Sequence, residues 1–349
     1  MSQHSKLLKA KFKIKDDGVH YSCNKPYSYP NIFFYLIDGG RGIGKTTTFI
    51  KKGLINARKG EEFIYMRRYR PEIKRFVSED SISPIIDGVR YVGDGAGGYK
   101  VFVENTKVGS IVSLSTARSY KSVDFSNVTL IIFDEAFVRQ TQSYHYLGEE
   151  VTQLLEFIST VVRTRTNVKV VLIGNHEDMF SPYHVYWKIP PFDKIYIDAD
   201  RGIYCEHAIN SPQLLEEEKK TGLFNLIKDT PYGDYHYQNR VLGATMENII
   251  DKPTNAKLLL RMIMEDRTLN IYTFYDKNND INLFCELKYK VIKDNIAYEF
   301  MSDGKLNYLD IDIYKKRFKN YIYRFHFNNR IFYNEETGGS IIQWVVDNV

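Results

Sequence analysis

The sequence predicts an α/β protein with a parallel β-sheet, followed by a smaller strand-rich α+β region. Three observations lead to this prediction. A glycine-rich segment follows an apolar run at residues 32–37, apolar runs without alternation recur at residues 128–133 and 168–173, and this rhythm ends near residue 200. Apolar runs without alternation are typical of parallel strands that are buried on both faces. A chain of 349 residues is also long enough for two domains.

The glycine-rich segment fits the pattern G-x-x-x-x-G-K-[ST] at every fixed position. Its glycines let the backbone curl so that successive N–H groups face phosphates, and the following helix directs the positive end of its dipole at them. The sequence therefore predicts a P-loop for a nucleoside triphosphate with Mg²⁺, in which Lys45 reaches the β- and γ-phosphates and Thr46 helps to hold the metal. The predicted nucleotide-binding residues are Gly39, Gly40, Arg41, Gly42, Ile43, Gly44, Lys45, Thr46 and Thr47.

Further elements of the α/β region follow in chain order. Residues 62–67 are typical of a second strand, which completes a βαβ unit. Three short β-like runs between residues 89 and 115 predict a β-meander inserted in the α/β core. Apolar residues recur at helical spacing over residues 149–164. A final strand is predicted at residues 194–197.

Changes in this pattern predict three parts of the chain. Residues 1–200 form a P-loop ATPase domain, residues 201–242 form a linker or lid, and residues 243–349 form a strand-rich domain. The linker contains a charged helix at residues 212–228, flanked by prolines. The last part contains β-like runs at residues 258–264, 269–275, 281–287 and 290–298, then a basic, aromatic helix near residues 314–325.

Composition limits the class of protein. The three cysteines are widely spaced, which supports neither a disulfide framework nor a cysteine-rich metal site and suits a reducing cytoplasm. No apolar run approaches the ~20 residues needed to cross a bilayer, and lysines occupy the start of the chain where a signal peptide would be apolar. A sequence pI near 8.7 is mildly basic and by itself does not decide for nucleic acid.

The apolar run at residues 128–133 ends in Asp134 and Glu135, which is the Walker B arrangement. Asp134 is predicted to hold Mg²⁺ and Glu135 to polarise the attacking water. The alternative, a strand that ends in two solvated acids, loses weight because open α/β sheets bind ligands at the carboxyl ends of their strands. The adjacent glutamate favours hydrolysis of ATP, in a P-loop NTPase of the additional-strand catalytic-glutamate type. The absence of an N-K-x-D signature disfavours GTP.

Three further polar residues stand at the ends of predicted elements. Asn175 follows the strand at residues 168–173, where it could sense the γ-phosphate or equally cap the next turn. Arg163 and Arg165 end the amphipathic helix. Cations are favourable there because of the helix dipole alone, and the sharper alternative is an arginine finger that reaches into a neighbouring subunit.

Several stretches in order resemble the genome-packaging ATPases of phi29-like podophages, relatives of the large terminase motors. These stretches are residues 40–45 (GRGIGK), residues 63–72 (FIYMRRYRPE), residues 133–135 (FDE), residues 163–165 (RTR) and Asn175. The combination of R-G-I-G-K with F-I-Y-x-R-R-Y-x-P-E is more specific than a P-loop alone. The resemblance is good over residues 30–180 and thin afterwards.

The resemblance implies a homo-oligomeric, pentameric ring at the portal vertex of a procapsid in the host cytoplasm, which uses ATP to drive double-stranded DNA inward. A structural packaging RNA is a further implied partner. Arg163 falls where the family carries its trans-acting arginine, and Lys121 falls where it carries a second trans-acting base. Arg70 matches a basic position that faces the DNA, although the family usually has lysine there. With the neighbouring Arg68 and Lys74, it forms the predicted DNA-binding set.

The resemblance also implies that the last domain has an RNase H-like nuclease fold that has lost catalysis. A two-metal nuclease needs several convergent carboxylates, one of them normally in the first strand, and residues 258–264 contain none. Two rivals to the packaging motor remain, namely a terminase-type protein with an active nuclease and a nucleotide-gated DNA-binding module, and a helicase is a further enzymatic alternative. Tyr27 and Tyr29 are guesses for adenine stacking.

Overall fold

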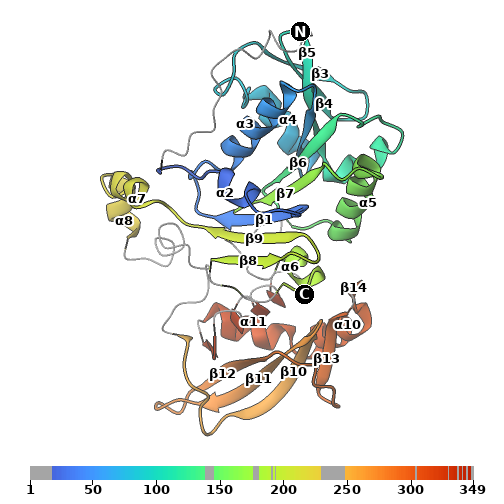
Figure 1. Ribbon diagram of the computed structural model, residues 1–349. Coiled ribbons are helices and arrows are strands. Elements are labelled where there is room, and N and C mark those ends of the chain that lie inside the picture. Colours follow the sequence, from blue (N-terminus) through green and yellow to red (C-terminus); the bar gives the residue numbers. More distant parts are fainter. Residues whose placement is uncertain are drawn as a thin grey trace.

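The computed structural model describes residues 18–137, 145–175, 181–189, 192, 194–228, 248–302, 305–328, 330–335, 338–339, 341–342 and 345–346. Two sheets organise these residues, one of nine strands and one of six. Figure 1 shows the larger sheet with helices on both of its faces and the smaller sheet with α10 and α11 beside it. No helix in this described part of the chain is long and apolar enough to span a bilayer.

The nine-stranded sheet has the order β3-β4-β5-β2-β6-β7-β1-β9-β8. The pairs from β5 through β9 are parallel, and β3, β4 and β8 add antiparallel edges. The strands are β1 (Phe34–Gly39), β2 (Glu62–Arg67), β3 (Val89–Gly93), β4 (Tyr99–Val103), β5 (Thr106–Ser113), β6 (Val128–Asp134), β7 (Lys169–Ile173), β8 (Ile195–Asp198) and β9 (Ile203–Ala208). The predicted parallel sheet and the predicted meander between residues 89 and 115 are confirmed, and the meander lies at one edge of the sheet.

Helices cover both faces of this sheet. One face packs against α2 (Asn24–Tyr27), α3 (Lys45–Ala57) and α4 (Arg70–Ser78), and the other packs against the 3₁₀ helix η1 (Leu114–Tyr120), α5 (Glu150–Val162) and α6 (Pro182–Tyr186). The central strands are buried along their whole length, as expected for strands covered on both faces. The carboxyl ends of β1, β2, β6 and β7 therefore lie side by side between the two helical layers, and we call this side of the sheet its carboxyl edge.

The sheet extends beyond the boundary predicted at residue 200. Strand β9 pairs with β1 in parallel, and β8 pairs with β9, so the chain stays in this sheet to Ala208. We did not predict β9 because Glu206 and His207 interrupt its apolar pattern. Each of them has a polar partner: His207 Nδ1 lies 2.6 Å from Asp38 Oδ1, and Glu206 accepts a hydrogen bond from Tyr204 at 2.9 Å. Paired polar groups can be buried at little cost.

The charged segment that follows forms two short helices instead of the single predicted helix. Helices α7 (Pro212–Glu218) and α8 (Gly222–Ile227) each begin after a hydroxyl residue that caps them. Ser211 accepts from Leu214 N and Thr221 accepts from Phe224 N, each at 3.2 Å. A second N-cap within the run ends the first helix and starts another. The predicted linker continues into residues 229–247, which lie outside the described residues.

The six-stranded sheet has the order β14-β13-β10-β11-β12-β15. Strands β10, β11 and β12 form an antiparallel meander, and β13 is parallel to β10. One face packs against the two helices. The elements are β10 (Lys257–Met264), β11 (Arg267–Tyr275), β12 (Ile281–Lys288), β13 (Ala297–Ser302), β14 (Lys305–Leu306), α10 (Tyr308–Arg317), α11 (Lys319–Phe327) and β15 (Ile331–Tyr333).

Two predictions in this region were wrong in position. The strand predicted at residues 290–298 begins only at Ala297, because side chains take the hydrogen bonds that a ladder would use. Thr268 binds Lys290 O at 2.8 Å and Ile292 N at 2.9 Å, and Asp294 accepts from Ile296 N at 3.2 Å. The helix predicted near residues 314–325 is two helices, α10 and α11, that join at Phe318.

Candidate nucleotide site

The P-loop lies between the end of β1 and the start of α3. Gly44 has φ +92° and is the N-cap of α3, so the helix begins at Lys45 and its first N–H groups face the loop. Gly39 has φ +149°, and a Cβ at this position would lie 2.0 Å from the carbonyl oxygen of Ala208 in β9. Glycine is therefore required at both positions, once for conformation and once for space.

The side chain of Lys45 folds back into the glycine-rich loop that precedes it. Its Nζ donates to the carbonyl oxygens of Gly39 at 2.9 Å and Gly40 at 2.6 Å, and the residue is only 7% exposed. Burial lowers the pKa of Lys45 to about 8, although the carboxylates of Asp38 and Asp134 counteract part of this effect. A buried cation whose hydrogen bonds go to carbonyl oxygens is incompletely neutralised, so the loop is electrostatically prepared for an anion.

The structure brings together the two residues predicted to hold magnesium. Thr46 Oγ1 lies at the start of α3 and donates to Asp134 Oδ1 at the end of β6, at 3.1 Å. Mg²⁺ takes oxygen ligands and is commonly held by one or two protein groups, with phosphate oxygens and water completing its octahedron. This hydroxyl and carboxylate fit that requirement. The described residues contain no group of three or more histidine, cysteine or acidic side chains placed to hold a metal alone.

Arg67 and Tyr65, at the end of β2, complete the surroundings of Asp134 and were not predicted. Arg67 forms an ion pair with Asp134 at 3.1 Å and with Glu135 at 2.5 Å. The Tyr65 hydroxyl donates to Asp134 Oδ2 and accepts from Arg67 Nε, both at 2.7 Å. Burial disfavours the charged guanidinium, but Asp134, Tyr65 and Glu135 outweigh that effect and raise the pKa of Arg67 above its ordinary value. Arg67 therefore stays charged and holds both Walker B carboxylates.

Glu135 reaches into solvent beside this cluster. Its side chain is 47% exposed, and its backbone has φ +55°, in the left-handed region that residues other than glycine rarely adopt. The turn at Glu135 follows β6 directly, and the Glu135 carboxylate lies against Arg67 at the end of β2. A glutamate that is accessible at the carboxyl edge of the sheet, next to the P-loop, is placed as a general base for a bound water would be.

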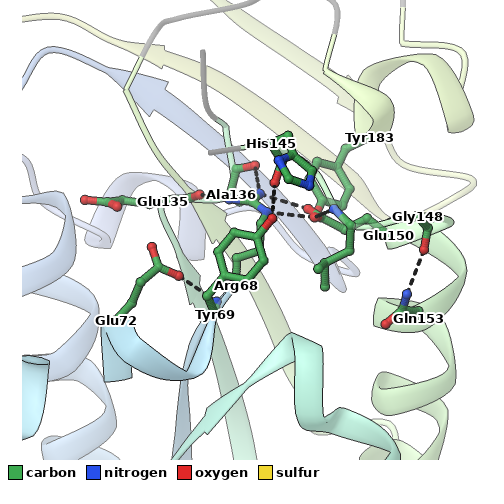
Figure 2. A network of polar contacts seen from close by, with 11 residues as sticks. Arg68, Tyr69, Glu72, Glu135, Ala136, His145, Gly148, Glu150, Gln153 and Tyr183 are labelled. Carbon is green, nitrogen blue, oxygen red and sulfur yellow. Dashed lines mark hydrogen bonds and ion pairs between the residues drawn. The ribbon is translucent and has the colours of Figure 1, made fainter. Parts of the chain in front are cut away.

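Arg68 has a different environment from the one predicted. The residue is 0% exposed and forms an ion pair with Glu150 of α5, as Figure 2 shows. It has no surface to offer to a DNA phosphate in this structure, and its prediction as a DNA contact is corrected accordingly. Side chains alternate along a strand, but the chain leaves β2 at Arg67, so alternation did not reveal which of the two arginines turns inward.

The other predicted basic residues lie on the surface. Arg70 and Lys74 are exposed on the first two turns of α4, on the helical layer that also contains α3. Lys121 is exposed directly after η1 and lines a shallow hollow with Gln153, Glu156 and Thr160 of α5. Arg163 is exposed at the C-cap of α5, where its charge helps to lower the pKa of Asp124 after the hydrogen bonds from Ser126.

Arg165, the neighbour of Arg163, has a structural role. Its guanidinium donates to the carbonyl oxygens of Ser126 at 2.7 Å, Val128 at 2.6 Å and Phe125 at 3.0 Å, and also to that of Val161. It thereby joins the end of α5 to the start of β6. Because β6 has seven residues, this start lies on the order of 20 Å from Asp134 at the other end. Arg163 thus lies at the opposite edge of the sheet from the P-loop of its own chain.

The remaining predicted residues are the γ-phosphate contact Asn175 and the two tyrosines considered for adenine stacking. Asn175 is half-buried just beyond the carboxyl end of β7, on the same edge as Asp134. Tyr27 does not fit adenine stacking, because its ring is stacked on Tyr35 at 5.2 Å, is covered by Lys52 Nζ at 5.0 Å, and has a buried hydroxyl. The ring centroids of Tyr29 and Tyr204 lie 5.3 Å apart.

His20, an exposed residue that was not among the predicted ones, lies next to Gly44 of the P-loop.

The fold is a mixed α/β fold with a largely parallel sheet, and a glycine-rich loop of the P-loop type joins β1 to α3. Comparison with known proteins identifies the family: residues 15–330 match the model of the podovirus DNA encapsidation protein (Gp16) family, and the chain belongs to that family. The DNA packaging protein of Bacillus phage phi29 is 29% identical over 264 residues, which cover 74% of this chain and 76% of that protein.

A second relative agrees with this assignment, and a solved structure has a similar fold. The DNA packaging protein of Bacillus phage B103 is 30% identical over 247 residues, covering 70% of this chain and 75% of the relative. The fold is similar to that in the bacteriophage Phi-29 viral genome packaging motor assembly, with a TM-score of 0.57, 21% identity, and coverage of 91% of this chain and 96% of that one. The likeness to this structure concerns the fold alone.

Proposed function

We propose that this protein is an ATP-driven translocase that packages double-stranded DNA into a phage procapsid as a homo-oligomeric ring. One observation carries the proposal beyond family membership: Lys45, Thr46, Asp134 and Glu135 converge at the carboxyl edge of one sheet. These four groups are the minimum set for binding and hydrolysing a nucleoside triphosphate. The names of the relatives supply the packaging process, the DNA and the assembly on a motor.

The geometry supports a division of roles within the site. Lys45 would move from the carbonyl oxygens of the loop to the β- and γ-phosphates, and Thr46 and Asp134 would hold Mg²⁺. When bound, the metal neutralises charge that develops on the phosphate oxygens. Glu135 would accept a proton from the attacking water as the bond between the γ-phosphorus and the bridging oxygen breaks and ADP leaves. Asn175 is placed at the same edge, where it could contact the γ-phosphate.

Arg67 supports a resting state in which hydrolysis is slow. Its ion pair with Glu135, at 2.5 Å, engages the carboxylate that would otherwise be free to accept a proton from water. A triphosphate in the loop would attract Arg67 in competition with the two Walker B carboxylates. Release of Glu135 by that competition would couple nucleotide binding to activation of the base.

The placement of Arg163 supports a site shared between two subunits. Its backbone lies near the amino end of β6, on the order of 20 Å from Asp134, so it cannot act on the nucleotide of its own chain. An exposed arginine on the far edge is available to a neighbouring copy in a head-to-tail ring. Arg165 is engaged with four backbone carbonyl oxygens, which favours Arg163 as the finger. Lys121, exposed beside α5, would act at the same interface.

Exposed Arg70 and Lys74 support a DNA-contacting surface on α4. Contacts of lysine and arginine with phosphates do not depend on base sequence, which suits a motor that must move any genome. A pentameric ring, a portal vertex, a structural packaging RNA and a location in the host cytoplasm are parts of the same proposal. They rest on the resemblance and on the assembly named for the similar structure.

The proposal includes a last domain with an RNase H-like nuclease fold that has lost catalysis. Its first strand, β10, contains no acidic residue, and Arg261 at its centre is paired with Asp294 at 2.8 Å. The described residues hold no cluster of acidic or histidine side chains suited to a metal. An arginine in the middle of the strand would repel the cations that two-metal cleavage requires. Nicking of DNA by the purified protein with Mg²⁺ or Mn²⁺ would instead favour the active-nuclease alternative.

A mixing experiment tests the shared site. ATP turnover is measured with double-stranded DNA for the wild type, Lys45→Ala, Arg163→Ala and an equal mixture of the two variants. Each variant is expected to fail alone, and the mixture to recover part of the turnover, because one interface can then combine an intact pocket with an intact finger. Mixed rings without any recovery would refute the shared site. Normal function of Glu135→Gln would favour a nucleotide-gated binding module, and strand displacement would favour a helicase.

A further inference from the structure

The Arg68 guanidinium connects three segments that are far apart in the sequence. It follows β2, and it donates through Nη1 to the carbonyl oxygen of Glu135 at 3.1 Å and through Nη2 to that of Ala136 at 2.9 Å. Its Nε and Nη2 also bind the two carboxylate oxygens of Glu150 at 2.7 and 2.8 Å. Figure 2 shows these contacts converging between β2, the turn after β6 and the start of α5.

The carboxylate of Glu150 is itself fixed by other groups. It accepts hydrogen bonds from Leu147 N at 2.8 Å and from the Tyr183 hydroxyl of α6. The side chains of Arg68 and Glu150 are 0% and 1% exposed, and the Arg68 guanidinium lies over the Tyr146 ring at 4.9 Å. A buried ion pair is retained only when its remaining hydrogen-bonding groups are satisfied in one geometry. Arg68 is therefore held in place more firmly than a surface arginine would be.

The two carbonyl oxygens that Arg68 binds belong to the turn that directs the proposed general base. Glu135 has the left-handed φ of +55°, which is costly for a residue with a Cβ and persists only where its surroundings impose it. On the amide side, Glu135 N donates to Asp134 Oδ1 at 3.1 Å and Ala136 N donates to Ile173 O at 2.9 Å. On the carbonyl side, the bonds come from Arg68. The direction of the Glu135 carboxylate follows from this backbone.

We propose that Arg68 is a positioning residue for hydrolysis, which fixes the backbone of Glu135 in its left-handed turn and anchors that turn to α5 through Glu150. This inference rests on the proposed ATPase function, since Glu135 needs a fixed direction only if it activates water. It assigns different tasks to the two adjacent arginines. Arg67 binds the side chain of Glu135 and can be displaced by a ligand, whereas Arg68 binds the backbone and stays in place.

Arg68→Lys is the variant that tests this proposal. Lysine keeps the positive charge opposite Glu150, but a single ammonium cannot reproduce a planar fork that bridges a carboxylate and two carbonyl oxygens. Arg267→Lys is the matched control, because Arg267 is 7% exposed and donates to a backbone carbonyl oxygen, Ile189 O at 3.0 Å, away from the nucleotide site. Both variants lose hydrogen bonds from a guanidinium to backbone carbonyl oxygens. Only the hydrogen bonds lost in Arg68→Lys hold the backbone of Glu135.

Three quantities are measured on the full-length chain: amide exchange of Ala136 without nucleotide, the Kd of a nonhydrolysable ATP analogue, and kcat for ATP. In Arg68→Lys we expect exchange of Ala136 to rise about tenfold, kcat to fall about 10- to 100-fold, as small misplacements of a catalytic group do, and Kd to change less than about threefold, because the P-loop is untouched. Arg267→Lys should leave Ala136 exchange and kcat within about twofold of the wild type.

Wild-type exchange at Ala136 with unchanged kcat in Arg68→Lys would overturn the proposal, and so would equal losses of kcat in the two variants at equal thermal stability. If Arg68→Lys does not fold, the double variant Arg68→Met with Glu150→Leu replaces the buried pair by apolar groups, which is often tolerated. The same rise in exchange and fall in kcat are expected from it. A wild type that binds but never hydrolyses ATP would refute the proposed ATPase, while the exchange measurement would still decide whether Arg68 fixes the turn.

Discussion

Raising the pH from about 7 to about 9 is expected to weaken nucleotide binding about tenfold, because Lys45 has a pKa of about 8. Lys45 is then roughly 90% charged at the lower pH and roughly 10% charged at the higher one. A bound triphosphate favours the charged ammonium, so the pKa of Lys45 is higher in the complex than in the free protein. Binding therefore takes up a proton in this window, and affinity falls as pH rises through the pKa of the free protein.

The triphosphate binds the protein whose Lys45 is charged, and the fraction in this form falls about tenfold between the two pH values. A tenfold change in affinity corresponds to about 1.4 kcal/mol of binding free energy. The physical cause is the burial of Lys45 against the carbonyl oxygens of Gly39 and Gly40. A lysine with an ordinary pKa of about 10.4 would stay charged over the whole range and would produce almost no change. The size of the change in Kd therefore measures how far burial lowers the pKa of Lys45.

Isothermal titration calorimetry with a nonhydrolysable ATP analogue at constant Mg²⁺ and ionic strength measures both consequences. In addition to the change in Kd, buffers with different ionisation enthalpies should reveal uptake of about half a proton at a pH of about 8. Lys45→Arg is the control, because a guanidinium remains charged over this range and should give a flat profile. A wild-type Kd that changes less than about twofold between these pH values would refute the reasoning.

Four further outcomes are expected. Glu135→Gln should lower kcat for ATP by about 10²- to 10⁴-fold with little change in nucleotide Kd, since general-base catalysis is worth that much; a loss confined to Kd would contradict the assigned role. In thermal denaturation, Arg165→Ala should lose about 1–3 kcal/mol of unfolding free energy, because the hydrogen bonds to the carbonyl oxygens are lost. The side chain of Arg163 is exposed, so Arg163→Ala should keep wild-type stability and lose ATP turnover. Replacing both Arg70 and Lys74 by alanine should reduce the slope of log K for DNA against log salt by about 2, measured by fluorescence anisotropy, and an unchanged slope would remove α4 from the DNA surface. Incubation of supercoiled DNA with the wild type and Mn²⁺ should produce no nicks, because the described part of the last domain offers no metal-binding carboxylate cluster.

The P-loop and Walker B strand could be recognised in the sequence because each is local. Phosphate binding needs consecutive residues at fixed offsets, and the carboxylates follow the apolar strand directly. The strands at residues 62–67, 128–134 and 169–173 agree with the predicted runs within one residue, because parallel strands buried on both faces have few polar positions. Strand β9 was missed for the opposite reason, since its buried Glu206 and half-buried His207 look like exposed residues without their partners.

By itself, the sequence determined the class of this protein: a motif of contiguous residues implies its own backbone conformation and its own chemistry. Only the tertiary structure decided the roles of the arginines. Arg67 and Arg68 are adjacent and chemically identical, yet one holds the Walker B carboxylates and the other is buried against Glu150. Arg163 and Arg165 divide in the same way between the surface and the carbonyl oxygens around β6. The partners of a side chain come from segments that are distant along the chain, and the free energy of burying a charge depends on those partners.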